Sequence, residues 1–462
     1  MTKNRQLFIT DPLTRNIPNN GVAKVIEPHT SEEWTVLRYE LESFVCEGEY
    51  KTGLERIFDT YLANLDKSEQ PAVWVSGFYG SGKSHLVRVL EYLWRDVEFP
   101  DGAVARGLTR LPQSIKDHLI DLTTQGKKNG GLWSAAGTLG AGLGKSIRLA
   151  LLSIIFRSAN LPEQYAPAQF VIWLMQNGYY DGVKTRIESA GKDFARELNN
   201  LWVSPVLANA LLAEAPDFAN DQIQARDFFK TRYPNRSEIS DDEMLLTIKD
   251  VLSLVSNKTG KLPCTLLVFD ELQQFIGEDP ERALQVQNIV EACSSRFGSR
   301  ILFVATGQSA LGKTTQLSKL KGRFTVQIEL SDKDVEQVVR EVVLRKKEDQ
   351  KPDLKAVLDK ASGEISRHLA DTRIGARATD NEELVPDYPL LPVRRRFWES
   401  VLRAVDSAGT AGQLRTQLRI VHEATREVAE KPLGTVVAGD FIYDQLKPDM
   451  LQSGVLLRDI EV

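Results

Sequence analysis

Apolar residues recur along this chain with two different spacings, and each spacing predicts a different kind of element. Residues 31–45 carry an apolar side chain every three or four positions, which is the period of a helix with one buried face. The side chains on this face are Trp34, Leu37, Leu41 and Phe44. The same period predicts helices over 52–65 and 84–94. Residues 1–30, which contain several prolines and an Asn-Asn-Gly turn, predict an extended arm.

Short, uninterrupted apolar runs lie between the helical stretches and predict buried strands. These strands are expected at 73–76, 265–271, 301–306 and 324–330. Strands that alternate with helices in this way indicate an α/β fold with a parallel sheet and flanking helices. The glycine-rich residues 122–145 are expected to form a loop with a short strand.

The pattern divides the chain into three parts. Residues 1–70 form the arm and the helices that lead into the core, and residues 71–330 form the core with a helical insertion at about 146–255. Residues 331–462 are expected to form a C-terminal helical lid, interrupted by a polar loop over 371–392. The final stretch, DMLQSGVLLRDIEV, resembles the start of another element, so we expect the natural chain to be longer.

Composition and charge exclude several classes of protein. The net charge is -5, which argues against a strongly basic nucleic-acid-binding domain. Three cysteines without Cys-x-x-Cys spacing predict neither a disulfide framework nor a zinc site, and they favour a reducing, cytoplasmic location. No run approaches the roughly 20 apolar residues of a membrane span, so no membrane association is expected.

The stretch GFYGSGKS, residues 77–84, meets every position of the G-x-x-x-x-G-K-[ST] pattern. Glycines at positions such as 77, 80 and 82 let the backbone turn tightly and direct its N–H groups at phosphate oxygens. Lys83 is expected to reach the β- and γ-phosphates of ATP, and the Ser84 hydroxyl to bind Mg²⁺. The other loop residues expected to contact nucleotide are Tyr79, Ser81 and His85. The alternative is a chance match in a glycine-rich turn, but an apolar strand before it and an amphipathic helix after it favour the phosphate-binding loop.

A second Gly-Lys-Ser occurs at 144–146. Here the first position of the pattern is Leu139 rather than glycine, and no clear apolar strand precedes it. We therefore interpret this stretch as a flexible turn, and a second nucleotide site as the less favoured alternative.

Two acids follow the predicted strand LLVFDE. Asp270 is expected to hold the Mg²⁺ shell, and Glu271 to act as the general base toward the attacking water. Alone, the pair would be interpreted as an acidic turn after a strand; the phosphate-binding loop in the same chain favours catalysis. Thr306, with Gln308 as second choice, ends the next strand and is expected to orient the water or sense the γ-phosphate, although an ordinary strand-end turn is equally compatible.

The order of these elements resembles an AAA+ ATPase of the initiator/STAND-like branch. The strings FVCEGEYKTGLERI, VSGFYGSGKSHLVR, FDELQQFIGE, KLKGRF and GTAGQLRTQLRIVHEA look closer still to the BrxC (PglY) family of BREX phage-defence proteins. The resemblance covers most of the chain. The strings FVCEGEY and TAGQLRTQLRIVHEA carry the family assignment, because the other strings are general ATPase features.

This resemblance implies roles for two arginines and one segment. Arg323 would act in trans on the γ-phosphate of a neighbouring subunit, and Arg415, or Arg419 one turn later, would reach the nucleotide from the lid. A surface arginine and a solvated helix face are the ordinary alternatives. The segment GEYKTGLERI resembles the part that lines the adenine in this class.

The resemblance also implies a function in bacterial defence that distinguishes host from phage DNA by methylation. The chain would be a homo-oligomeric, Mg²⁺-dependent ATPase in complex with other BREX proteins, namely a methyltransferase, a phosphatase-like protein and small components. The main alternative is a nucleotide-gated scaffold that binds ATP and recruits partners with little hydrolysis. Contact with DNA is expected to be indirect; the basic clusters 345–347 and 394–396 are interpreted as solvated helix faces rather than as DNA contacts.

Overall fold

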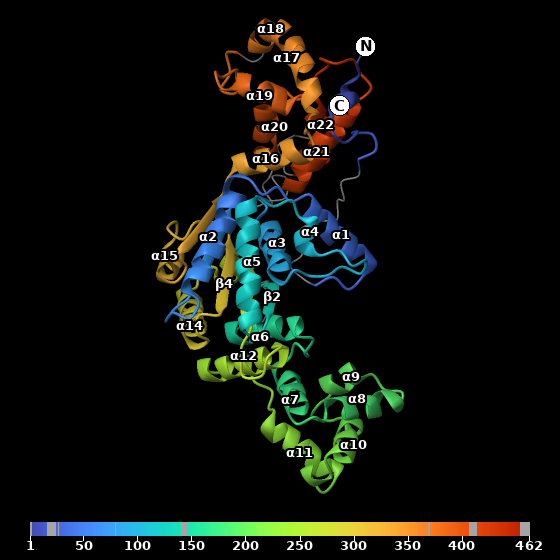
Figure 1. Ribbon diagram of the computed structural model, residues 1–462, viewed down its shortest axis with the longest axis vertical. Coiled ribbons are helices and arrows are strands. Elements are labelled where there is room, and N and C mark those ends of the chain that lie inside the picture. The colour runs from blue at the N-terminus through green and yellow to red at the C-terminus, as the bar shows by residue number, and fades with distance from the viewer. Residues whose placement is uncertain are drawn as a thin grey trace.

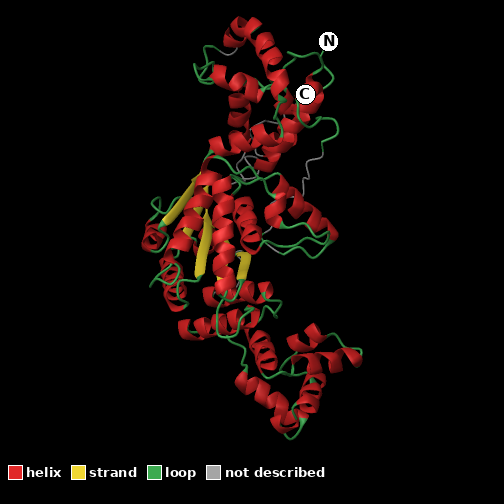
Figure 2. Cartoon of the chain, viewed as in Figure 1, coloured by secondary structure: helices red, strands yellow, loops and turns green. Residues whose placement is uncertain are grey.

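The computed structural model describes residues 2–15, 25, 27–78, 80–139, 146–367, 370–405 and 414–452. These residues form three parts stacked along one axis, with C-terminal helices at one end, a sheet in the middle and the helical insertion at the other end (Figure 1). All strands lie in the middle part, and both ends are helical (Figure 2).

The sheet has five parallel strands in the order β2-β3-β4-β1-β5. The strands are β1 (Val73–Gly77), β2 (Leu132–Thr138), β3 (Cys264–Asp270), β4 (Ile301–Gly307) and β5 (Val326–Leu330). The predicted α/β class is confirmed, and so are the four predicted strands. Strand β4 lies between β1 and β3, so the glycine-rich loop after β1 and the acids after β3 are separated by one strand at the carboxyl edge of the sheet.

Alternate residues of the central strands supply two hydrophobic cores. Val73 and Val75 of β1 face one core, and Trp74 faces the other, where it packs edge-on against Phe324. The first core lies under α1 (Ser31–Glu42), α2 (Gly48–Asn64), α3 (Lys83–Arg95) and α5 (Gln113–Lys128). The second lies under α6 (Ile147–Ser158), α12 (Asp241–Val255) and α14 (Pro280–Arg296). The short helices of this middle part are α4 (Ala105–Leu108), α13 (Leu272–Ile276) and α15 (Thr315–Ser318).

The predicted loop with a short strand over 122–145 is confirmed for the strand and wrong for residues 122–128, which are helical. Helix α5 continues to Lys128, and β2 is a seven-residue strand that pairs with the whole of β3. The residues LWSAAGT contain no continuous run of large apolar side chains. Alanines fill the space on both faces of this strand: Ala135 packs into one core and Ala136 into the other. A strand therefore does precede the second Gly-Lys-Ser, contrary to our expectation. Residues 140–145, which hold most of that motif, lie outside the described residues.

The insertion is helical, as predicted, and leaves the sheet after β2 and returns to β3. Between α6 and α12 it contains α7 (Tyr165–Gln176), α8 (Tyr180–Ser189), α9 (Phe194–Asn199), α10 (Pro205–Glu214) and α11 (Gln222–Arg232). Local capping explains where several of these helices begin. Ser204 caps α10 ahead of a proline, Asp221 caps α11, and Ser240 with Glu243 forms a reciprocal cap on α12.

The C-terminal part contains seven α-helices among its described residues. They are α16 (Asp332–Val342), α17 (Lys351–Lys360), α18 (Ser362–Arg367), α19 (Asp380–Asp387), α20 (Pro392–Val405), α21 (Leu414–Glu427) and α22 (Phe441–Gln452). Helix α19 lies inside the predicted loop over 371–392, so that prediction is wrong. The helix is hard to recognise because charges rather than apolar side chains fix it: Asp380 and Asp387 are buried and paired with arginines.

The N-terminal residues do not form a free arm. A short 3₁₀ helix, Asn4–Leu7, packs against the C-terminal helices, and Leu7 and Phe8 are buried there. The Asn4 backbone N–H donates to the Lys431 carbonyl at 3.0 Å, and the Asn4 amide donates to the carbonyls of Val428 and Thr435. The beginning and the end of the described chain therefore lie together (Figure 1).

Candidate functional site: the carboxyl edge of the sheet

The loop between β1 and α3 has the backbone of a phosphate cradle. Gly80 and Gly82 have φ angles of 85° and 88°, a left-handed conformation that favours glycine. No side chain caps α3, so the first N–H groups of this 13-residue helix have neither an intrahelical acceptor nor a side-chain cap. The Ser81 hydroxyl is buried and has no hydrogen-bond partner among the described residues. The loop thus offers donors and the positive end of a helix dipole to an anion. Tyr79 lies outside the described residues.

Lys83 is held over this loop by the loop itself. Its Nζ donates to the carbonyls of Gly77 and Phe78, both at 2.8 Å, which uses two of its three hydrogens. Burial lowers the pKa of Lys83 to about 8, although the charges of Asp270 and Glu271 oppose this shift. A buried ammonium group in this position gains stability from an added anion.

Thr306 brings the two acids together. Its hydroxyl donates to Asp270 Oδ1 at 2.6 Å and accepts the backbone N–H of Glu271 at 2.9 Å. The single hydroxyl hydrogen is therefore spent on Asp270, and Thr306 positions both acids; its predicted role toward water or phosphate stays a prediction. Gln308, the second choice, is exposed.

Glu271 differs from Asp270 in backbone and in burial. Its φ is 60°, an unusual left-handed conformation for a non-glycine residue that turns the chain sharply after β3. Burial, and next the charge of Asp270, raise the pKa of Glu271, whereas Lys83 lowers it. A carboxylate with a raised pKa at a solvent-accessible turn is suited to accept a proton from water.

The oxygen groups here match the chemistry of a Mg²⁺ site. Asp270 is 3% exposed, with Oδ1 fixed by Thr306, and Ser84 is the second residue of α3. Mg²⁺ in nucleotide sites takes one or two protein oxygens of this kind together with phosphate oxygens and water. These two residues would hold the ion, which when bound neutralises charge on the phosphates.

Two contacts to the loop were not predicted as such. The Tyr50 hydroxyl, on α2, donates to the Ser81 carbonyl at 2.7 Å, and a Cβ on Gly82 would collide with that hydroxyl. The Leu414 N–H, at the start of α21, donates to the Gly80 carbonyl at 2.8 Å. Tyr50 lies in the segment expected to line the adenine, so the structure places that segment beside the loop. A third missed residue, Gln273, accepts the Ser309 N–H at 2.8 Å and ties the turn after β3 to the turn after β4.

The two predicted lid arginines lie on a helix that begins at the loop, whereas His85 faces away from the loop. Helix α21 begins at the loop, one residue before Arg415, but the Arg415 side chain lies outside the described residues, and Arg419 is half-buried on the same helix. The His85 ring faces α1 instead: its Nε2 lies 3.0 Å from the Glu40 carbonyl, and the ring packs edge-on against Phe44. The structure therefore does not bring the His85 side chain to the other loop residues.

Arg323 lies at the opposite edge of the sheet. Its carbonyl accepts the N–H of Ala72, immediately before β1, and β1 is five residues long, or roughly 16 Å. Arg323 therefore cannot reach its own chain's loop. Its guanidinium pairs with Glu69 at 3.2 Å and with Glu291 at 2.7 Å, and all three side chains are partly exposed. The role of Arg323 toward a neighbouring subunit stays a prediction.

The prediction of solvated helix faces is wrong for the cluster 394–396 and for Lys346, whereas Arg345 and Lys347 are exposed as expected. Arg395 pairs with Asp387, Arg396 holds Asp380 with two guanidinium nitrogens, and Arg394 donates to the Val437 carbonyl. In the other cluster Lys346 is 3% exposed and its ammonium group lies over the Phe8 ring. Lys346 and the three arginines hold the C-terminal helices together, because each of these four cations finds its acceptor inside the protein.

Comparison with known proteins adds little. No family model matches the sequence. In a comparison with solved structures, a chain of Drosophila ORC bound to DNA aligns with 96% of this chain and 72% of its own, at 12% identity and a TM-score of 0.32. A likeness at that level carries no argument. None of the described helices combines the length and apolar character needed to cross a membrane.

Proposed function

We propose that this chain is a Mg²⁺-dependent ATPase of the AAA+ type that serves as an ATP-driven component of a BREX phage-defence complex in the cytoplasm. The observation that carries the ATPase part is the meeting of Lys83, Asp270 and Glu271 at one edge of the sheet, with Thr306 fixing the two acids. The BREX part is supported by the sequence resemblance alone.

Each residue has a defined task in this proposal. The loop N–H groups and Lys83 bind the phosphates, and Asp270 with Ser84 holds the metal ion. Glu271 accepts a proton from the attacking water at a carboxylate oxygen, which its raised pKa favours. Arg323 leaves Glu69 and Glu291 to reach the nucleotide of a neighbouring subunit, which makes hydrolysis depend on homo-oligomer assembly.

One observation favours a second candidate, the nucleotide-gated scaffold. The Leu414 N–H of α21 bonds directly to the Gly80 carbonyl, so any change of the loop on binding nucleotide is felt by the C-terminal helices. A protein that used ATP only to reposition these helices, and so to recruit other BREX proteins with DNA bound indirectly through them, would need the loop but not Glu271.

Single-turnover ATP hydrolysis at several protein concentrations separates the two candidates. The variants are Glu271→Gln and Arg323→Ala, with Lys313→Ala, an exposed lysine, as control. For an ATPase, the rate rises with protein concentration, and both variants still bind ATP but lose about a hundredfold or more in rate. Binding of ATP without turnover by the wild type at every concentration supports the scaffold instead.

A further inference from the structure

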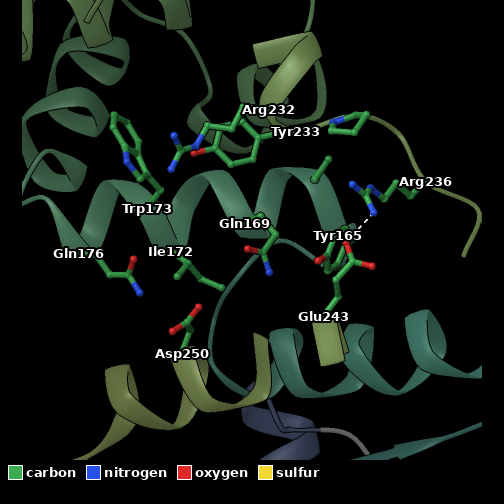
Figure 3. Close-up of a pocket in the computed structure, with 12 residues that line it drawn as sticks. Tyr165, Gln169, Ile172, Trp173, Gln176, Arg232, Tyr233, Arg236, Glu243 and Asp250 are labelled. Carbon is green, nitrogen blue, oxygen red and sulfur yellow. Dashed lines mark hydrogen bonds and ion pairs between the residues drawn. The ribbon is translucent and has the colours of Figure 1, made fainter. Parts of the chain in front are cut away.

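A pocket of about 290 Å³ opens in the helical insertion, at the far end of the molecule from the C-terminal helices. One face of α7 forms its floor, the end of α11 with residues 233–236 forms one wall, and α12 forms the other (Figure 3). The residues on which the argument depends are Trp173, Gln176, Arg232, Tyr233 and Asp250.

The wall at the end of α11 presents two hydrogen-bond donors. Tyr233 is 7% exposed, and its buried hydroxyl interacts with the Arg232 guanidinium alone among the described side chains, which leaves the hydroxyl hydrogen free to donate. The Arg232 guanidinium lies over the Tyr233 ring, 5.9 Å from its centre, and beside its hydroxyl (Figure 3). No acid of the described chain forms an ion pair with Arg232. A guanidinium and a hydroxyl side by side fit an anionic oxygen.

The opposite wall presents acceptors. Asp250 projects from α12 beside Gln176 (Figure 3), and among the described residues it forms no ion pair. Burial raises the pKa of Asp250, and the Lys249 charge and the Gln176 amide only partly oppose this. A carboxylate held this way is stabilised by N–H or O–H donors of a ligand.

A flat apolar side chain lies beside Arg232, on the same side of α7 (Figure 3). Trp173 lines the pocket from α7 and is held by ring contacts with Phe170, at 6.1 Å, Tyr179, at 5.8 Å, and Phe218, at 5.4 Å. A fixed indole ring favours stacking with a second flat ring.

We propose that this pocket binds a free nucleotide. Its ring would lie on Trp173, its phosphate would accept from Arg232 and Tyr233, and its hydroxyl or N–H groups would donate to Asp250 and Gln176. A free amino acid fits less well, because its two charges are adjacent whereas Arg232 and Asp250 lie on opposite sides of α7 (Figure 3). A nucleic-acid strand fits less well, because residues 146–255 contain more acids than bases and a strand requires neutralisation of many phosphates.

The test uses the full chain carrying Lys83→Ala, so that the phosphate-binding loop does not contribute and the result does not depend on the ATPase proposal. Calorimetric titration with the four ribonucleoside 5′-monophosphates is expected to give saturable one-to-one binding of at least one of them, with a Kd below about 1 mM. Arg232→Ala and Asp250→Asn are each expected to weaken it about tenfold or more, and Tyr233→Phe less, because it removes only a hydroxyl.

Matched controls lie on the same helices outside the pocket. Lys230→Ala on α11 and Asp242→Asn on α12 change the same charges and are expected to leave the Kd unchanged. Three results would overturn the proposal: no saturable binding of any monophosphate, equal binding of inorganic phosphate, or equal loss in the controls. Tighter binding of a free amino acid would assign the pocket to that ligand instead.

Discussion

Two regions of this molecule bury charged side chains, and they do so in opposite ways. At the carboxyl edge of the sheet, Lys83 lies near Asp270 and Glu271 but forms no ion pair with either of them. In the C-terminal helices, Asp387 is completely buried and accepts from Arg340 at 2.6 Å and from Arg395 at 2.7 Å. Lys83, Asp270 and Glu271, here called the open set, lie beside a loop that can bind an anion. Asp387, Arg340 and Arg395, here called the paired set, neutralise one another.

The pKa values express the same difference. Burial lowers the pKa of Lys83 to about 8 and raises the pKa of Glu271, so the folded protein disfavours both charges. Burial also opposes the charge of Arg340, but the hydrogen bond and the charge of Asp387 outweigh it and raise the Arg340 pKa. In these two places the buried charge without an ion pair faces a loop that can bind an anion, and the paired charges hold helices together.

The largest effect is expected from breaking the paired set. Asp387→Ala removes the fully buried acid that Arg340 and Arg395 share, and the acids that stay near these arginines are partly exposed, so the C-terminal helices should lose about 3 kcal/mol. Hydrogen exchange of the backbone amides of α16 and α20 measures this change. The control is Glu423→Ala, which removes an exposed pair with Arg426 and should cost less than about 1 kcal/mol. Equal effects of the two substitutions would contradict the distinction between the regions.

A substitution in the open set should weaken ligand binding and leave the stability of the protein unchanged. Lys83→Ala is expected to weaken ATP binding about a hundredfold or more, because a charge-assisted contact with the phosphates is lost. The thermal stability of the ATP-free protein should not fall, because the substitution removes a buried cation that lacks a counter-charge. Calorimetric titration and thermal unfolding of the same variant measure both quantities. A clear loss of thermal stability would place Lys83 among the architectural charges.

The open set was predictable from the sequence, and the paired set was not. Residues 77–84 form a local motif between an apolar run and an amphipathic helix, so Lys83 and the loop were found with their strand and helix. Asp270 was found because β3 is a continuous apolar run that ends in acids. In both cases the signal lies within a few consecutive residues.

The paired charges give no such signal, because their partners lie far away along the chain. Three consecutive arginines at 394–396 look like a solvated face until Asp380 and Asp387 are placed beside them. The same holds for Tyr50 and Leu414, which reach the loop from α2 and α21. Strand β2 was predicted only as a short strand within a loop, because a strand packed by alanines lacks the apolar run from which its position and length could be recognised.

The deprotonation of Lys83 should make both ATP affinity and protein stability depend on pH, with a smaller effect than the substitution has. With a pKa of about 8 the ATP-free protein loses the Lys83 proton as the pH rises past that value, so ATP affinity should fall about tenfold per pH unit above it. At pH 8, ATP binding should take up about half a proton, measured by calorimetry in buffers of different ionisation enthalpy. Because the pKa is lower than in the unfolded chain, the same group should make the ATP-free protein more stable as the pH rises from about 8 to 10. Lys83→Ala should abolish both effects.

The smallest expected effect is on ATP binding, and it should distinguish Tyr50, which positions the phosphate-binding loop, from Tyr61, which donates to a carbonyl outside that loop. Tyr50 and Tyr61 both lie on α2, are 2% and 0% exposed, and donate to backbone carbonyls, that of Ser81 at 2.7 Å and that of Arg300 at 2.9 Å. Tyr50→Phe and Tyr61→Phe should each cost about 1 kcal/mol of stability. Only Tyr50→Phe should also weaken ATP binding, by about threefold to tenfold, because only the Ser81 carbonyl belongs to the phosphate-binding loop. If both variants bind ATP as the wild type does, the phosphate-binding loop keeps its shape without the Tyr50 hydrogen bond. Tyr50 would then be an ordinary buried tyrosine rather than part of the ATP site.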